Sequence, residues 1–143
     1  MADYTTTVRS PWPPEKAFDY LADLRNFSEW DPGVSRSELV TGAACGVGAE
    51  FDVTANGTEL RYRITEFRSP ETVAFEARTR FLTSRDRVTI TEDPLGCRVR
   101  YDAVLELNGP LGNLDSLLAP VFRRIATKAA DGLLEALDGT SRT

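Results

Sequence analysis

The residues of this sequence best suited to chemistry are two tyrosines and two carboxylates, because the chain contains no histidine. Without histidine, the Ser-His-Asp and Cys-His arrangements of nucleophilic catalysis are excluded. Tyr62 and Tyr101 alternate with apolar residues, which places both on the side of their strands that we expect to be buried. A buried phenol needs a hydrogen-bond partner. A ligand or a pocket water would make these tyrosines part of a binding site, whereas a backbone carbonyl or the cavity rim would make them structural.

Glu66 and Asp86 fall on the same inward side of their predicted strands. A carboxylate enclosed by apolar groups has a raised pKa and can act as a general acid or base. Both residues lie near strand ends, and Phe67 beside Glu66 suggests a β-bulge that exchanges the two faces. We therefore favour an outward position for both, and the identity of any catalytic residue stays open.

The sequence predicts neither a metal site nor a cofactor. Cys45 and Cys97 lie far apart and, without histidine, do not supply the three or four ligands of a zinc site. We expect Cys97 to be a small buried residue and Cys45 a loop thiol. Gly46-x-Gly48 leads into a strand rather than a helix, so it predicts a turn and not a dinucleotide site.

Composition predicts one globular domain spanning residues 1–143, with an ordered core of about 3–138. The 143 residues are 41% hydrophobic and 27% charged, which is ordinary for a soluble protein of one domain. No run approaches the ~20 apolar residues of a membrane span, and the N-terminus does not resemble a secretory signal, so we expect a cytoplasmic protein. The net charge of −5 argues against binding to nucleic acid. A monomer and a homodimer are both compatible with the sequence.

The tyrosines and carboxylates must be positioned by a sheet. Alternation with a period of two predicts seven strands, at about residues 4–9, 34–41, 50–55, 59–67, 72–80, 85–92 and 97–108. Short turns such as Asn56-Gly57 require neighbouring strands to be antiparallel. One face of this sheet is apolar and the other carries arginine interleaved with glutamate and aspartate, so one face is solvated and the other needs a cover.

A long C-terminal helix is the only predicted element that can cover this face, and two short helices are expected to brace it. Two short helices are predicted after the first strand, one around Phe18 and one from Leu24 to Trp30 with Asp23 as its cap. A long helix is predicted from Pro110 to Asp138, and we expect residues 140–143 beyond it to fray. Its N-cap is Asn113, its stop is Gly139, Pro120 predicts a kink or a new start, and Gly132 indicates close approach to the sheet. Its apolar stripe consists of Leu114, Leu117, Leu118, Val121, Phe122, Ile125, Ala129, Leu133, Leu134 and Leu137.

The order of strand, two short helices, six-stranded meander and long helix is an α+β helix-grip arrangement. The supporting motifs are Phe18-Asp19-Tyr20-Leu21-Ala22-Asp23, Trp30-Asp31-Pro32-Gly33, Gly46-Val47-Gly48, Tyr62-Arg63-Ile64-Thr65-Glu66-Phe67-Arg68-Ser69-Pro70 and Leu107-Asn108-Gly109-Pro110-Leu111. On these, the sequence resembles the SRPBCC superfamily, which includes the birch pollen allergen, START lipid-transfer domains and bacterial polyketide cyclase/dehydrase-like proteins. The resemblance implies that a hydrophobic small molecule binds between a curved sheet and the long helix.

We therefore expect a cavity between the sheet and the C-terminal helix. The predicted lining residues are Phe27, Trp30, Phe51, Val53, Leu60, Tyr62, Ile64, Phe75, Ala77, Val88, Ile90, Tyr101, Ala103, Leu105, Leu118, Phe122 and Ile125. The preferred function is binding or transport of a lipid, polyketide or aromatic molecule. The alternative is an aromatase-type polyketide cyclase/dehydrase, with acid–base help from Tyr62, Tyr101 or an inward carboxylate. A third class, an interaction module, requires an exposed apolar patch that the sequence pattern does not indicate.

Overall fold

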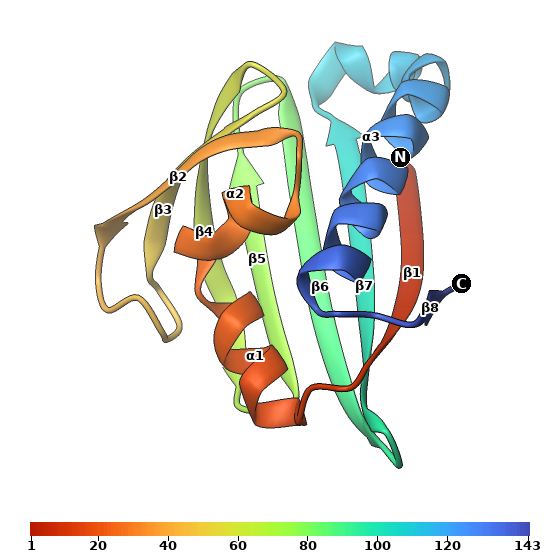
Figure 1. Cartoon of the computed structure of the whole chain (residues 1–143). Helices are drawn as coiled ribbons and strands as arrows, with labels where there is room; N and C mark the ends of the chain where they lie inside the picture. The colour runs from red at the N-terminus through yellow and green to blue at the C-terminus, as the bar shows by residue number, and fades with distance from the viewer.

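The polar–apolar alternation produces one antiparallel sheet flanked by helices. The computed structural model describes the backbone of residues 1–143 and all side chains except those of Asn113 and Asp115. The elements, labelled in Figure 1, are β1 (Ala2–Ser10), α1 (Pro14–Ala22), the 3-10 helix η1 (Leu24–Asn26), α2 (Phe27–Trp30), β2 (Val34–Thr41), β3 (Glu50–Ala55), β4 (Thr58–Arg68), β5 (Thr72–Arg78), β6 (Leu82–Asp93), β7 (Gly96–Leu107), the 3-10 helix η2 (Gly109–Leu114), α3 (Asp115–Ala136) and β8 (Ser141–Arg142).

The sheet has the order β2-β3-β4-β5-β6-β7-β1-β8, and every neighbouring pair is antiparallel. The seven predicted strands are confirmed. The turn between β3 and β4 has the two positive φ angles of a tight hairpin, 50° at Asn56 and 80° at Gly57. The strands are therefore set in register by short turns along most of the chain.

The eighth strand corrects the prediction that the C-terminal tail frays. In β8, Arg142 pairs with Val8 of β1. The amide N–H of Thr143 donates to the carbonyl of Thr7 at 3.0 Å, and the hydroxyl of Thr6 donates to the carbonyl of Thr143 at 2.9 Å. The outer edge of β1 offers unpaired backbone groups. The tail is held because it forms hydrogen bonds with this edge.

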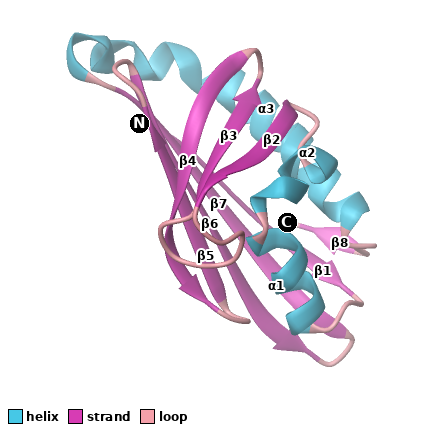
Figure 2. Cartoon of the chain, turned by 90° about the vertical axis from the view of Figure 1, so that its left-hand side faces the viewer, coloured by secondary structure: helices cyan, strands magenta, loops and turns pink.

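The long helix α3 lies on the apolar face of the sheet, as predicted (Figure 2). The prediction that it is the only cover is wrong, because α1 and α2 bury Phe18, Leu21, Phe27 and Trp30 in the same core. The side chain of Asp23 accepts a hydrogen bond from the amide of Arg25 at 3.0 Å, which confirms its role as a cap. The predicted cap of the long helix, Asn113, lies outside the described side chains. The 3-10 helix η2 replaces the first turns of the predicted α-helix, and α3 continues through Pro120 without a new start.

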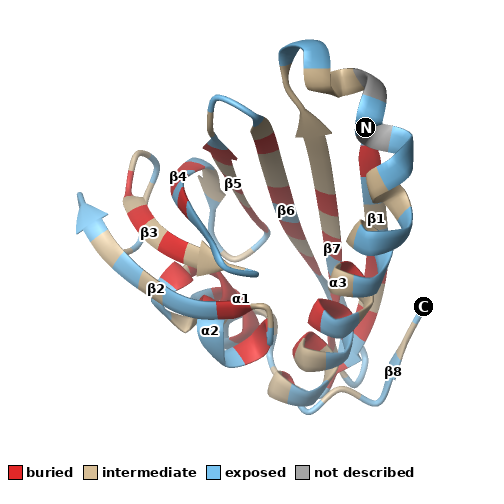
Figure 3. Cartoon of the chain, turned by 90° about the horizontal axis from the view of Figure 1, so that it is seen from above, coloured by how far each residue is buried: buried red, intermediate tan, exposed pale blue. Residues whose placement is uncertain are grey.

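Among the described side chains of α3 and of Leu114 at the end of η2, deep burial is confined to the C-terminal half of α3. Ala129 and Leu133 are 1% exposed, whereas Leu114, Leu117 and Val121 are 44%, 71% and 55% exposed. The prediction that the whole apolar stripe is covered is therefore wrong for these three residues. The reason is visible in Figures 1 and 3, where the short helices lie beside the C-terminal turns of α3 and leave its N-terminal turns uncovered.

The close approach predicted for Gly132 involves another helix and not the sheet. A Cβ atom at Gly132 would overlap the carbonyl oxygen of Trp30 and would lie 3.2 Å from Cδ of Pro32. The glycine therefore lets the end of α2 pack directly onto the backbone of α3. This contact ties the short helices to the long one above the sheet.

Candidate ligand cavity

A cavity of about 200 Å³ lies between the apolar face of the sheet and α3. Residues from α2, β2, β3, β4, β6, β7 and α3 contribute to its wall. They are Phe27, Asp31, Val34, Ala55, Asn56, Thr58, Leu60, Tyr62, Leu82, Ser84, Asp86, Tyr101, Ala103, Leu105, Phe122, Ile125, Ala126 and Ala129. The wall is thus mainly apolar, with a few polar groups, which is typical of small-molecule sites.

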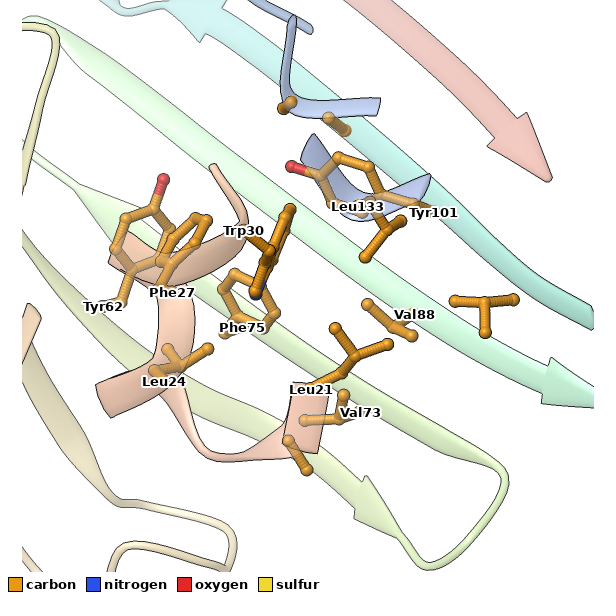
Figure 4. Packing of buried hydrophobic residues seen from close by; sticks show 14 of the residues in the cluster. Leu21, Leu24, Phe27, Trp30, Tyr62, Val73, Phe75, Val88, Tyr101 and Leu133 are labelled. Atoms are coloured by element: carbon orange, nitrogen blue, oxygen red, sulfur yellow. The ribbon is translucent and has the colours of Figure 1, made fainter. Parts of the chain in front are cut away.

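Next to the cavity, aromatic rings fill the space between α2 and the sheet. Phe27 and Trp30 of α2 are stacked with ring centroids 4.9 Å apart. Trp30 meets Tyr101 edge to face at 5.5 Å, and Phe27 meets Phe75 at 5.7 Å. Figure 4 shows these rings between the sheet and the helices. The short helix α2 therefore closes one part of the sheet and leaves the other part open to the cavity.

Eight of the seventeen residues predicted to line a cavity do so in the structure. These are Phe27, Leu60, Tyr62, Tyr101, Ala103, Leu105, Phe122 and Ile125. The remaining nine lie outside this wall: Trp30, Phe51, Val53, Ile64, Phe75, Ala77, Val88 and Ile90 are buried, and Leu118 is half-buried. The eight buried residues pack in the closed core, since alternation identifies the inner face of a strand but not which helix lies above it.

The wall also contains residues that the sequence pattern did not predict there. These are Asp31, Val34, Ala55, Asn56, Thr58, Leu82, Ser84, Ala126 and Ala129. A signal was available for some of them. Ala126 and Ala129 follow Phe122 and Ile125 by one helical turn, and Ser84 shares the inward side of β6 with Asp86.

The two tyrosines find side-chain partners on β6. The hydroxyl of Tyr62 is 2.8 Å from that of Ser84, and the hydroxyl of Tyr101 donates to the Oδ1 atom of Asp86 at 3.1 Å. Burial, followed by the negative charge of Asp86, raises the pKa of both phenols well above the ordinary value. Both tyrosines therefore remain protonated near neutral pH and serve as hydrogen-bond donors or acceptors.

Asp86 points inward, which corrects the outward position favoured from the sequence. It is 6% exposed and lines the cavity. The correction has a simple cause: β6 begins at Leu82 rather than near residue 85, so Asp86 lies inside the strand and keeps its inward side. Burial raises the pKa of Asp86 to about 7, with a further increase from Asp31 and opposing hydrogen bonds from Tyr101 and Tyr62.

Glu66 lies on the outer face, as favoured from the sequence. The register of β4 against β5 shifts between Ile64 and Glu66, which is the predicted bulge. The carboxylate of Glu66 forms ion pairs with Arg68 and Arg87, both at 2.8 Å. Phe67 consequently turns inward and meets Phe18 with ring centroids 5.1 Å apart. Glu66 therefore has no part in the cavity.

Asp31 is a second carboxylate in the cavity wall. It directly follows α2, is 8% exposed, and accepts a hydrogen bond from the amide of Gly33 at 2.9 Å. Burial raises its pKa, and this hydrogen bond opposes the increase. Asp31, Asp86 and the two tyrosines are therefore polar groups in a mainly apolar wall. One of the two carboxylates, Asp86, can exchange a proton near neutral pH.

Other kinds of site find less support in the described part of the chain. No group of three or more cysteine, aspartate or glutamate side chains there has a metal-binding arrangement. Cys45 is exposed and Cys97 is buried, as predicted. No helix there is long and apolar enough to cross a membrane.

A sheet whose apolar face holds a C-terminal helix above a cavity defines the helix-grip class of proteins. Solved structures of this class align with nearly the whole chain. They include XoxI from Bacillus cereus (TM-score 0.71, 17% identity, covering 96% of both chains) and Ara h 8.0201 (TM-score 0.67, 14% identity, covering 94% of this chain and 96% of that one). A third is the di-domain ARO/CYC protein BexL from the BE-7585A biosynthetic pathway (TM-score 0.70, 19% identity). The alignment covers 95% of this chain and 48% of that one.

The sequence of residues 1–138 matches the family described as polyketide cyclase/dehydrase and lipid transport, and the chain belongs to that family. No curated protein matches the chain. The identities with the solved structures are below 20% for the three named above, so these likenesses define the fold alone.

Proposed function

We propose that this protein binds a hydrophobic small molecule in the cavity between the sheet and α3. The observation that carries the proposal is the position of the cavity, which opens where α2 ends and where β4, β6 and β7 face Phe122 and Ile125 of α3. Membership of a family that includes lipid transport supports the same function. The expected role is binding or carriage of an apolar ligand.

The size of the cavity indicates the size of the ligand. A cavity of about 150 Å³ in another protein holds benzene, and this one measures about 200 Å³. Most sites for larger molecules measure about 300–1,000 Å³. The cavity as described therefore suits a molecule with one ring or a short chain. A polycyclic polyketide would require α3 to move outward.

One observation favours an enzyme as the second candidate. Asp86 has a pKa of about 7 and lies within hydrogen-bond distance of Tyr101, so it could move a proton during ring closure or dehydration at neutral pH. BexL, a structural neighbour, is described as an ARO/CYC protein. Cyclase or dehydrase activity would use the same cavity, so ligand binding is the common requirement of both candidates.

Filling the cavity should abolish ligand retention. Ala103 lies in the wall of the cavity on β7 and is 5% exposed. In Ala103→Phe the added ring occupies the ligand volume, so a small molecule that co-purifies with the wild type should be lost. Native mass spectrometry of protein purified without denaturation measures this directly.

The matched control is Val104→Phe, which places the same ring on the opposite face of β7, where Val104 is half-buried. This variant should retain the co-purified molecule. Overpacking at residue 103 is expected to destabilise the fold by about 1–3 kcal/mol, and thermal unfolding shows whether the variant remains folded at the temperature of purification. Equal retention by a folded Ala103→Phe variant would refute the proposed site.

A further inference from the structure

The cavity contains two carboxylates and no cationic side chain. Asp31 and Asp86 line it, together with Asn56, Thr58, Ser84 and the two tyrosines. All of its lining residues have described side chains, and none is a lysine or an arginine. The chain has no histidine that could supply a positive charge. Any charge that the wall carries is therefore negative.

The arginines of β6 do not neutralise this charge, because they lie on the other face of the sheet. Arg85 and Arg87 flank Asp86 in sequence and therefore point outward. Arg85 donates to Glu106 at 2.9 Å, and Arg87 forms an ion pair with Glu66 at 2.8 Å. The carboxylate on the cavity side of β6 therefore has no cationic partner on the outer face of the sheet.

Few donors serve the two carboxylates. Asp31 accepts from the amide of Gly33 and Asp86 accepts from Tyr101, with Tyr62 also interacting with Asp86. An ionised carboxylate has about four acceptor positions, and burial of a charge without sufficient partners is unfavourable. A ligand with a hydrogen-bond donor would occupy the free acceptor positions of Asp31 and Asp86. A cationic donor would also compensate their negative charge. An incoming anion would meet like charges.

The remaining wall suits the rest of such a ligand. The rings of Phe27, Tyr62, Tyr101 and Phe122 belong to the lining, and aromatic faces attract ammonium groups. The aliphatic side chains of β4, β7 and α3 provide an apolar surface for a ring or a short chain. The volume of about 200 Å³ admits a molecule of this kind.

We propose that the cavity selects a small, mainly apolar molecule that carries a protonated amine, and that it rejects a carboxylate of the same shape. This inference rests on the proposed function, because it names the chemical class of the ligand for the same cavity. The charge-assisted hydrogen bonds from the ammonium group to Asp86 and Asp31 provide the selectivity. The aromatic and aliphatic wall holds the apolar body.

A matched ligand series tests this selectivity. The full chain is titrated calorimetrically with 2-phenylethylamine, 2-phenylethanol and phenylacetate, which share a ring and have similar length. The amine should bind about tenfold more tightly than the alcohol, and phenylacetate should bind about tenfold more weakly than the alcohol, since a charged donor gives the stronger hydrogen bond and like charges repel. In Asp86→Asn the preference of the amine over the alcohol should fall to about threefold or less.

Asp52→Asn is the control, because Asp52 lies on the outer face, paired with Arg61 at 2.9 Å, and should leave the order of affinities unchanged. Asp31→Asn provides a second variant should Asp86→Asn not fold, and the order in the wild type is decisive by itself. Binding of phenylacetate as tight as that of the amine, or an unchanged amine preference in Asp86→Asn, overturns the inference while leaving ligand binding intact. Failure of all three molecules to bind removes the proposed function as well.

Discussion

Replacement of Gly132 by alanine is expected to lower the free energy of unfolding by about 2–4 kcal/mol. Helix propensity alone predicts the opposite, because alanine is about 1 kcal/mol better than glycine inside a helix. The structure reverses the sign, since the new Cβ would overlap the carbonyl oxygen of Trp30 and press on Pro32. Accommodation would push α2 away from α3 and disturb the stacked pair of Phe27 and Trp30. Urea-induced unfolding of the purified variant measures the loss.

Gly112→Ala is the matched control for this substitution. A Cβ at Gly112 would lie 3.5 Å from the carbonyl oxygen of Leu107, an ordinary van der Waals contact, and its φ lies outside the left-handed region. This variant should be within about 0.5 kcal/mol of the wild type. A Gly132→Ala protein as stable as the wild type would show that α2 does not pack on α3 as described.

Replacement of Asp86 by asparagine is expected to stabilise the protein more strongly at pH 8 than at pH 5, by about 2–3 kcal/mol. The pKa of Asp86 is about 7 in the folded state against an ordinary value of 3.8. Between these pH values the folded state binds the proton that the unfolded state has released, so the contribution of this group to stability falls as pH rises. Each pKa unit corresponds to about 1.4 kcal/mol, which gives roughly 4 kcal/mol in total between the ordinary pKa of 3.8 and the folded pKa of about 7. About 2–3 kcal/mol of this loss falls between pH 5 and pH 8. Asparagine cannot ionise, so the variant avoids this loss.

The measurement compares the free energies of unfolding of the wild type and Asp86→Asn from pH 5 to pH 8. The difference between the two proteins isolates Asp86 from Asp31, whose pKa is raised by burial in the same direction. Asp52→Asn should instead be less stable than the wild type from pH 5 to pH 8. A hydrogen bond from Arg61 lowers the pKa of Asp52, so its ionised form stabilises the fold at every pH above the ordinary pKa. A stability difference for Asp86→Asn that does not grow with pH would mean that the carboxylate is not enclosed.

Alternation was sufficient to predict the sheet, because each strand buries only one face. Phe51 and Val53 are buried, and they face Tyr62 and Leu60 across the strand pair, so a period of two indicates the buried side directly. The boundaries were harder. A difference of three residues at the start of β6 placed Asp86 at a strand end in the prediction and inside the strand in the structure. The most informative titratable residue of the cavity was therefore assigned to the wrong side.

The position of the cavity on the sheet could not be predicted, since it depends on which helix covers which part of the sheet. Phe75 and Tyr101 look alike in the sequence pattern, but Phe75 lies beneath Phe27 in the closed core, whereas Tyr101 reaches the cavity. The C-terminal strand was missed for a similar reason: Arg142 pairs with Val8 across most of the sequence, and no local pattern reports a contact at that separation.

The most direct test is a crystal structure of the wild-type protein soaked with 2-phenylethanol, an uncharged molecule whose size suits the cavity. Electron density for the ring is expected inside the cavity, enclosed by Leu60, Leu105 and Ile125, with the hydroxyl directed toward Asp86 or Tyr101. Density for the ligand only on the outer surface, or side chains that close the space between α3 and the sheet, would contradict it.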